Sequence, residues 1–291
     1  SSNIATKYLI GIFFGGLVIM IGGFLDDRWH WKPGKQIIFP VLAAFIVIAS
    51  GIGITFITNP FGGQIHLDGW QRILFWFQGI PYRLTLPADV FTLLWLLGMM
   101  YTTKFLDGLD GLVSGVTVIG GLVIAALALD PIVHQNGTAL LALILAGAFF
   151  GFIPWNWHPA KIFLGEGGSI FAGFMLGVLA IISGSKVTTT LLVVGIPILD
   201  TLWVILRRIF WEHRSPFAGD RKHLHHRLLD LGFSHRAVVL MLYFLAAYFG
   251  ITALFLQSSG KLIALLILSG TMVLLGAGLV YGYWKRKSHS M

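Results

Sequence analysis

Long apolar segments separated by short polar ones dominate the chain, and this pattern predicts helices that cross a membrane. A bilayer core about 30 Å thick needs roughly 20 helical residues, and nine apolar runs of 16 to 24 residues have suitable lengths. The runs do not alternate with period two, which disfavours a membrane barrel. We therefore predict an all-α fold, a polytopic membrane helix bundle with about nine spanning helices. The predicted segments are residues 8–25, 36–57, 88–103, 112–129, 137–155, 167–183, 187–206, 236–256 and 261–284.

Composition strengthens this prediction. Of the 291 residues, 56% are hydrophobic and only 11% are charged, whereas about a quarter of the residues in soluble domains are charged. No soluble domain, long linker or internal repeat is apparent, so residues 1–291 are expected to form a single integral membrane domain. The chain has no cysteine, which excludes disulfide and thiolate chemistry.

Two polar connections are longer than a turn. The outer connection, residues 59–87, contains Trp70 and Trp76 between turn glycines, and we expect an interfacial hairpin or amphipathic segment with a structural role. The inner connection, residues 207–235, holds five of the ten histidines. A polar loop of this length in a compact protein is usually functional or disordered, and its residue types favour function.

The basic residues indicate the orientation of the chain. With the amino terminus outside, fifteen of the twenty lysines and arginines fall on the inner side of the predicted topology. This bias follows the positive-inside rule, and it weakens the nucleic-acid interpretation of the net charge of +8. The acids also cluster at or near the inner face, although they contribute little to topology. These inner acids are Asp26, Asp27, Asp107, Asp110, Glu166, Asp200, Glu212, Asp220 and Asp230.

Two of four polar segments present paired aspartates. In GFLDDRWHWKPGKQ, residues 23–36, Asp26 and Asp27 end a predicted helix, and a cation would relieve the repulsion between them. Taken alone, such a pair at a helix end is more often a solvated cap. In KFLDGLDGL, residues 104–112, Asp107 and Asp110 are three residues apart and share a helix face. Two such carboxylates suit Mg²⁺, although the same spacing occurs in plain turns.

The third polar segment, NWHPAKIFLGEGGSI at residues 156–170, brings Asn156, Lys161 and Glu166 to the same side of the membrane. Its glycines precede a predicted helix, and backbone N–H groups at such a helix start can bind an anion. A flexible loop with ordinary charges is the alternative.

The fourth polar segment joins IPILDTLWVILRR, residues 196–208, to the histidine-containing connection. Asp200 lies inside a predicted spanning helix on roughly the same face as Arg207 and Arg208, so an intramembrane ion pair and a catalytic role both stay open. The sequence DRKHLHHRL, residues 220–228, mixes Arg, Lys and His as a diphosphate clamp would. Zinc is the competing interpretation for its histidines, but nearby cations disfavour a metal there.

Together, and in this order, the four segments resemble the polyprenyl-phosphate N-acetylhexosamine-1-phosphate transferases of bacterial envelopes. FLDD, DGLDGL and NWHPAKIFLGEGGS resemble three motifs of that family, and HLHHRL resembles the version in the branch that makes lipid-linked N-acetylglucosamine. The muramoyl-pentapeptide branch has a different histidine motif. The family has eleven helices, so the resemblance implies that the first two are missing before Ser1.

The resemblance implies an enzyme of the bacterial cytoplasmic membrane that transfers a sugar 1-phosphate from a UDP-sugar to undecaprenyl phosphate at the cytoplasmic face. It implies Mg²⁺, or alternatively Mn²⁺, as cofactor, and it leaves a homodimer open. By matching positions, Asp26 and Asp27 would be catalytic and would serve the lipid phosphate. The metal would be held by Asp107, Asp110 and Glu166. The nucleotide sugar would contact Asn156, Lys161, Phe163, His223, His225, His226 and Arg227.

Two positions depart from the family pattern. Lys104 stands where the family usually has asparagine, and Glu166 replaces the usual aspartate. The sequence assigns no definite role to Lys35, Lys104 or Asp200. A degenerate family member and a secondary transporter are therefore retained as alternatives, although a transporter predicts midplane acids and an internal repeat. A membrane zinc protease lacks its H-E-x-x-H motif.

Overall fold

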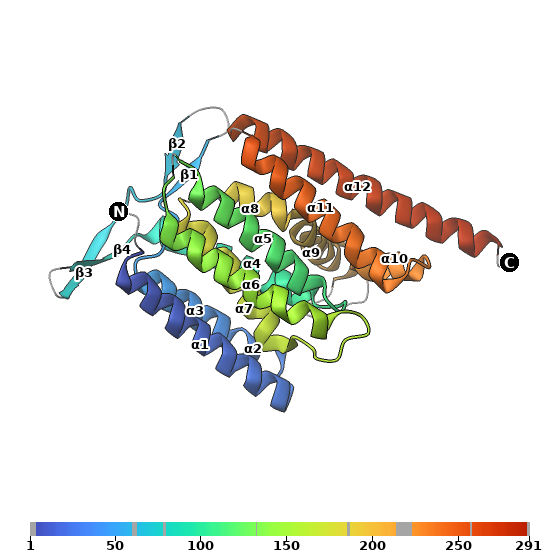
Figure 1. The fold of residues 1–291 in the computed structure, drawn as a ribbon, viewed down its shortest axis with the longest axis horizontal. Coiled ribbons are helices and arrows are strands. Elements are labelled where there is room, and N and C mark those ends of the chain that lie inside the picture. The colour runs from blue at the N-terminus through green and yellow to red at the C-terminus, as the bar shows by residue number, and fades with distance from the viewer. Residues whose placement is uncertain are drawn as a thin grey trace.

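The computed structural model describes residues 4–59, 63–77, 80–131, 133–184, 187–213, 223–256 and 258–289. Figure 1 shows a bundle of long helices with two small hairpins at one end. In chain order the elements are α1 (Thr6–Trp29), α2 (Pro33–Gln36), α3 (Ile38–Ala49), β1 (Phe56–Thr58), β2 (Gln64–His66), β3 (Arg72–Phe77), β4 (Ile80–Leu84), α4 (Leu86–Leu106), α5 (Leu112–Leu129), α6 (Asn136–Asn156), α7 (Gly165–Ile182), α8 (Val187–Val193), α9 (Gly195–Arg207), a π-helical turn η1 (Arg208–Glu212), α10 (Leu224–Asp230), α11 (His235–Phe255) and α12 (Ser258–His289).

Seven helices in the described part of the chain are long and apolar enough to cross a membrane. They are α1, α4, α5, α6, α7, α11 and the apolar stretch of α12, and each coincides with a predicted segment. The prediction of an all-α integral membrane protein is therefore confirmed.

One predicted spanning segment, residues 36–57, is wrong as a single helix. The helix α3 has only 12 residues, and the chain leaves it at Gly51, whose φ of 90° is left-handed. This conformation is common just after a helix and suits glycine. Beyond it, Ile52 and Ile54 are almost completely buried outside any helix. The apolar run was therefore long because an extended, buried segment follows the helix.

A second predicted segment, residues 187–206, is divided between α8 and α9. The division falls at Val194, next to Gly195 and Pro197. Proline has no N–H and cannot donate to the carbonyl four residues earlier, here that of Val193. The prediction of one continuous helix is therefore wrong in this segment as well.

Two antiparallel hairpins occupy the outer connection, and the first of them begins before it, at β1 within the predicted helix 36–57. Strands β1 and β2 pair, and β3 pairs with β4 with an irregularity between Ile73 and Phe75. The expected hairpin is thus present, at the end of the bundle opposite α10 (Figure 1). The two hairpins are the only sheets in the described residues, and the core consists of helix side chains together with the segment after α3.

The central helices are α5 and α7, which are the most buried of the spanning helices. Helix α5 packs against α6 and α11, while α7 packs against α1 and α4. At the α1–α7 crossing, a Cβ added to Gly23 would lie 2.1 Å from the Cα of Gly167. The absence of both side chains lets the backbones meet, and this contact brings the end of α1 to the beginning of α7.

Candidate active site at the polar end of the bundle

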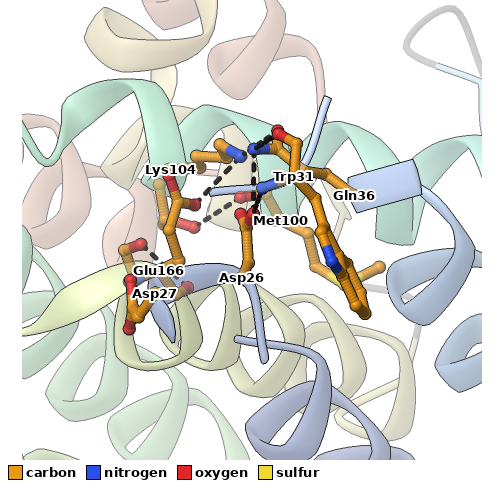
Figure 2. Close-up of polar contacts among 9 residues, drawn as sticks. Asp26, Asp27, Trp31, Gln36, Met100, Lys104 and Glu166 are labelled. Atoms are coloured by element: carbon orange, nitrogen blue, oxygen red, sulfur yellow. Dashed lines mark hydrogen bonds and ion pairs between the residues drawn. The ribbon is translucent and has the colours of Figure 1, made fainter. Parts of the chain in front are cut away.

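The four polar segments of the sequence meet at the end of the bundle opposite the hairpins. Three elements supply its central contacts: the end of α1, the end of α4 and the beginning of α7 (Figure 2). Alternating helix directions explain the meeting, because the ends of α1, α4 and α6 and the beginnings of α5, α7 and α11 then face the same side. The structure therefore brings together motifs that are separated by more than a hundred residues.

The carboxylate of Asp26 is buried and fixed by hydrogen bonds. After α1, His30 adopts a left-handed conformation with φ 49°, which turns the chain back toward the helix. The backbone N–H of Trp31 then donates to Oδ1 of Asp26 at 2.9 Å, and Nε2 of Gln36 donates to the same oxygen at 3.2 Å. Asp26 is only 6% exposed, so these bonds offset part of the cost of burying its charge.

The neighbouring Asp27 is exposed and faces the amino end of α7. Its Oδ1 accepts from the backbone N–H of Glu166 at 3.2 Å. Its Oδ2 would lie 2.8 Å from a Cβ on Gly165, a residue with φ 72°. Glycine is therefore required at position 165 by both its backbone conformation and the aspartate. A carboxylate is favoured at this helix start, where unpaired N–H groups carry partial positive charge.

Lys104 joins the first and third polar segments. Its Nζ lies 2.9 Å from Oε2 of Glu166 and donates to Oε1 of Gln36 at 2.9 Å. Because Gln36 also donates to Asp26, a continuous chain runs from Asp26 through Gln36 and Lys104 to Glu166 (Figure 2). Lys104, which the sequence left without a role, is the central link of this chain. Gln36 was missed, and no signal marked it beyond its place at the polar start of an apolar run.

Asp107 lies among other carboxylates just beyond the end of α4. Part of its surface faces solvent, yet desolvation of the carboxyl group raises its pKa to about 7, with further contributions from Glu166, Asp110 and Asp27. A hydrogen bond from the hydroxyl of Ser169 acts in the opposite direction. A bound cation would relieve this repulsion. The oxygen donors of this cluster fit a hard divalent ion such as Mg²⁺.

Asp110 has a different environment. Its Oδ2 lies 2.8 Å from Nδ1 of His158 and accepts from the backbone N–H of Ala160 at 3.1 Å. The ring of His158 stacks on that of His235 at 3.9 Å between centroids. Atoms of Asp110, His158 and His235 lie within 4.8 Å of one another and could hold a metal ion. Neither histidine was predicted, although His158 lies inside the third polar segment and His235 ends the inner connection.

Asn156, expected to contact a nucleotide, is buried and fastens three segments together. Its Oδ1 accepts from the backbone N–H of Gly111 at 3.1 Å and from the hydroxyl of Ser114 at 2.8 Å. Its Nδ2 donates to the carbonyl of Ile162 at 3.1 Å. The amide thus has a structural role, and its contact with a nucleotide stays a prediction.

Three further predicted residues lie outside the described contacts of the carboxylate cluster. Phe163 is 74% exposed. The Nζ of Lys161 lies 5.6 Å from the centre of the Trp155 ring, and Lys35 is exposed on α2. The roles of Phe163 and Lys161 in binding a nucleotide sugar stay predictions, and Lys35 still has no assigned role.

The short helix α10 carries the histidines of the fourth polar segment. Nδ1 of His223 lies 2.9 Å from Oδ2 of Asp200, and the backbone N–H of Leu224 donates to Oδ1 at 2.9 Å. Asp200 therefore holds the beginning of α10, whereas Arg207, its expected partner, pairs through Nε with Glu212 at 3.2 Å. Residues 214–222, which include Asp220, Arg221 and Lys222, lie outside the described residues.

Helix α10 packs directly on the second polar segment. A Cβ on Gly108 would lie 2.4 Å from Nε2 of His225 and 3.1 Å from Nε2 of His226. Burial, followed by repulsion from His226, His223 and His235, lowers the pKa of His225 to about 3. Arg227 follows these histidines at the end of the same short helix, half-buried. Within the described residues, these histidines do not form a three-ligand metal group, so the zinc interpretation for them gains no support.

Comparison with known proteins shows the family of the chain. The model of glycosyl transferase family 4 matches residues 9–184. A probable undecaprenyl-phosphate N-acetylglucosaminyl 1-phosphate transferase of Bacillus subtilis is 32% identical over 270 residues, covering 89% of this chain and 69% of that protein. A decaprenyl-phosphate N-acetylglucosaminephosphotransferase of Mycolicibacterium smegmatis is 34% identical over 254 residues, covering 79% of this chain and 58% of that protein.

A relative from another branch is also similar. The phospho-N-acetylmuramoyl-pentapeptide-transferase of Desulforamulus reducens is 33% identical over 284 residues, covering 85% of this chain and 79% of that protein. The described part of this chain has helices long enough to span a membrane, and the relatives carry the names of sugar-phosphate transferases, so the class is that of a membrane phosphoglycosyltransferase. The chain belongs to glycosyl transferase family 4.

Proposed function

We propose that the protein transfers N-acetylglucosamine 1-phosphate from its UDP-sugar to undecaprenyl phosphate, releasing UMP. The observation that carries this proposal is the meeting of Asp26, Asp27, Asp107 and the α10 histidines at one end of spanning helices. A lipid phosphate anchored in the bilayer and a water-soluble nucleotide sugar can both reach such a site. The names of the relatives support the acceptor and the sugar.

In the proposed reaction, an oxygen of the lipid phosphate attacks the phosphorus that bears the sugar. A new P–O bond forms there, and the bond from this phosphorus to the oxygen of UMP breaks. Phosphoryl transfer requires positioning and charge neutralisation more than covalent chemistry from the protein. Asp26 and Asp27 would orient the lipid phosphate, and Asp26, held rigidly by Trp31 and Gln36, would accept its proton.

The proposed metal is Mg²⁺, with Mn²⁺ as a substitute. We favour Asp107 as its ligand, because this carboxylate lies among Glu166, Asp110 and Asp27, and burial together with these charges raises its pKa to about 7. Asp110 and Glu166, the other predicted ligands, have protein partners in His158 and Lys104. When bound, the ion would neutralise charge on the diphosphate. The histidines of α10, which lie over Gly108, would contact the diphosphate or the sugar.

We place the polar end of the bundle at the cytoplasmic face of the bacterial inner membrane. The distribution of lysines and arginines supports this orientation. It also suits the chemistry, because nucleotide sugars are charged and stay in the aqueous compartment where they are made. The hairpins β1–β2 and β3–β4 would then face the outer side.

The test is to incubate the purified full-length protein with Mg²⁺, undecaprenyl phosphate and a panel of radiolabelled UDP-sugars. Labelled lipid and an equal amount of UMP are expected with UDP-N-acetylglucosamine, and the Asp26→Asn and Asp107→Asn variants should lose at least about a hundredfold in rate. Failure of every sugar, with activity restored by Lys104→Asn/Glu166→Asp, would identify a degenerate member. Solute movement without transfer by either protein would instead support a transporter.

A further inference from the structure

The ammonium group of Lys104 lies within the carboxylate cluster, where a metal is proposed to bind. Its Nζ is 2.9 Å from Oε2 of Glu166, and the side chains of the two residues are 13% and 33% exposed. The Oε2 atom itself is buried. Separating this ion pair would leave the buried ammonium of Lys104 without a counter-charge, which is unfavourable. Glu166 therefore has a fixed positive partner that belongs to the protein itself.

The same ammonium group also orders the first polar segment. A lysine ammonium has three donors and no acceptor, so the contact at 2.9 Å requires the oxygen end of the Gln36 amide to face Lys104. The nitrogen end then faces Asp26 and the carbonyl of Trp31, to which it donates at 3.2 and 3.0 Å. Lys104 thereby fixes the orientation of the amide that positions Asp26.

A divalent ion bound to Glu166 would be close to this ammonium group. A divalent ion and a lysine ammonium a few ångströms apart repel each other, and the repulsion is stronger in a partly buried site than in water. Asp107 lies just beyond the end of α4, and its described neighbours are Ser169 and the carboxylates of Glu166, Asp110 and Asp27. None of these neighbours is a cation. The positions therefore divide the cluster into an ammonium-bound part at Glu166 and a part around Asp107 that has acidic neighbours.

We propose, on the basis of the transferase function above, that Lys104 is a permanent internal cation and that Glu166 is its counter-ion rather than a metal ligand. The two residues act as one electrically neutral unit that positions Asp26 through Gln36. The divalent ion is held around Asp107, with Asp27 and Asp110 as its acidic neighbours. Lys104 and Glu166 are positioning residues in this arrangement.

The test is Mn²⁺ binding to the purified full-length protein, measured by electron paramagnetic resonance without nucleotide sugar or lipid. Lys104→Met should lower the Kd about threefold or more, and Glu166→Gln should raise it, because each change alters the charge by one unit. The double variant Lys104→Met/Glu166→Gln removes a neutral pair, so its Kd should stay within about twofold of the wild-type value.

A Kd raised about tenfold in the double variant, as expected for Asp107→Asn, would show that Glu166 is a ligand and would overturn the proposal. Absence of saturable Mn²⁺ binding in both the wild type and Lys104→Met would overturn it as well. Lys32→Met removes an exposed lysine from the neighbouring connection and should leave the Kd unchanged.

Two further variants protect the test against misfolding. Lys104→Arg keeps the charge and should retain the wild-type Kd, and Lys104→Gln/Glu166→Gln repeats the neutral replacement with polar side chains. Because the binding assay contains no substrate, its result is valid even if the protein transfers no sugar. Conversely, an enzyme that transfers sugar but fails the double-variant test would leave the proposed function intact and remove only this inference.

Discussion

Asp200 shows how one buried carboxylate can anchor a functional helix. It accepts a hydrogen bond from the backbone N–H of Leu224 and pairs with the ring of His223. The side chains of His223 and Asp200 are only 7% and 12% exposed. Because α10 has only seven residues and cannot be stable alone, these bonds to α9 are needed to place His225 and His226 over Gly108.

Replacing Asp200 by leucine should destabilise the protein and displace α10. Loss of both acceptors leaves a buried N–H and an imidazole unpaired, which costs about 1–3 kcal/mol for each buried group. Thermal unfolding in detergent, followed by circular dichroism, would measure the change. Asp68→Leu is the matched control, because Asp68 also pairs with a histidine, His66, but both are well exposed. Equal losses in the two variants would contradict the anchoring role of Asp200.

The buried ring of His225 predicts a dependence of stability on pH. Its pKa is lowered to about 3 in the folded protein, whereas it is about 6.5 in an unfolded chain. Between these values the unfolded state binds the additional proton, so folding stability falls as pH decreases below about 6.5. At pH 5 this group alone should remove about 2 kcal/mol of the stability present at pH 7.5.

The apparent Tm at pH 5 and pH 7.5 checks this prediction. His225→Gln should show a smaller decrease in Tm on acidification than the wild type, because its side chain cannot bind the proton. His66→Gln, at an exposed position, should show the wild-type decrease. Equal decreases in all three proteins would exclude His225 as the titrating group.

At the scale of helices, glycine pairs determine how closely the elements approach. Gly23 on α1 and Gly167 on α7 let the two backbones touch, and close contact through small residues is a common form of helix packing in membranes. This crossing has a direct effect on the site, because Asp26 and Asp27 follow Gly23 within one turn. Their positions relative to Glu166 depend on the separation of α1 from α7.

Gly23→Ala should therefore separate the helices and impair both folding and activity. The new Cβ would meet backbone atoms of Gly167 that cannot rotate away, and overpacking of this kind costs about 1–3 kcal/mol. Gly98→Ala, within α4 but with open space around it, should be neutral or stabilising by up to about 1 kcal/mol. Unfolding midpoints and transfer rates measure both effects. A Gly23→Ala variant with the stability and activity of the wild type would show that α1 and α7 do not need glycine at this crossing.

At the scale of the whole molecule, polar chemistry and hairpins occupy opposite ends of one bundle (Figure 1). The absence of cysteine from the chain makes this orientation easy to test with single introduced cysteines. Gly34 and Gly69 are suitable positions, since both are exposed and have no neighbouring atoms in the way.

A membrane-impermeant maleimide should label Gly34→Cys only in inverted vesicles and Gly69→Cys only in right-side-out vesicles. The physical reason is the excess of basic residues at the end that includes Gly34. Detergent-solubilised protein, in which both cysteines should react, is the control. The reverse labelling pattern would overturn the proposed orientation.

Hydrophobicity predicted the spanning helices well where a run ends at polar residues, as α5 does between Gly111 and Asp130. It failed at Gly51 and Pro197, because local backbone chemistry interrupts a helix without changing the hydrophobic character of the run. The aspartates were recognisable from their spacing within single motifs. The partner of Lys104 was not, because Glu166 lies 62 residues further along the chain and only the packing of α4 on α7 joins them.

The hydrogen bonds of Asn156 have a consequence for the thermodynamics of ligand binding. One amide ties the beginning of α5, the end of α6 and the segment before α7 into a single rigid unit. A ligand that binds beside this unit causes little further loss of conformational entropy in those segments. More of the free energy of its contacts therefore appears as affinity. Asn156 would thus favour binding by ordering these three segments in the free protein, even without itself contacting the ligand.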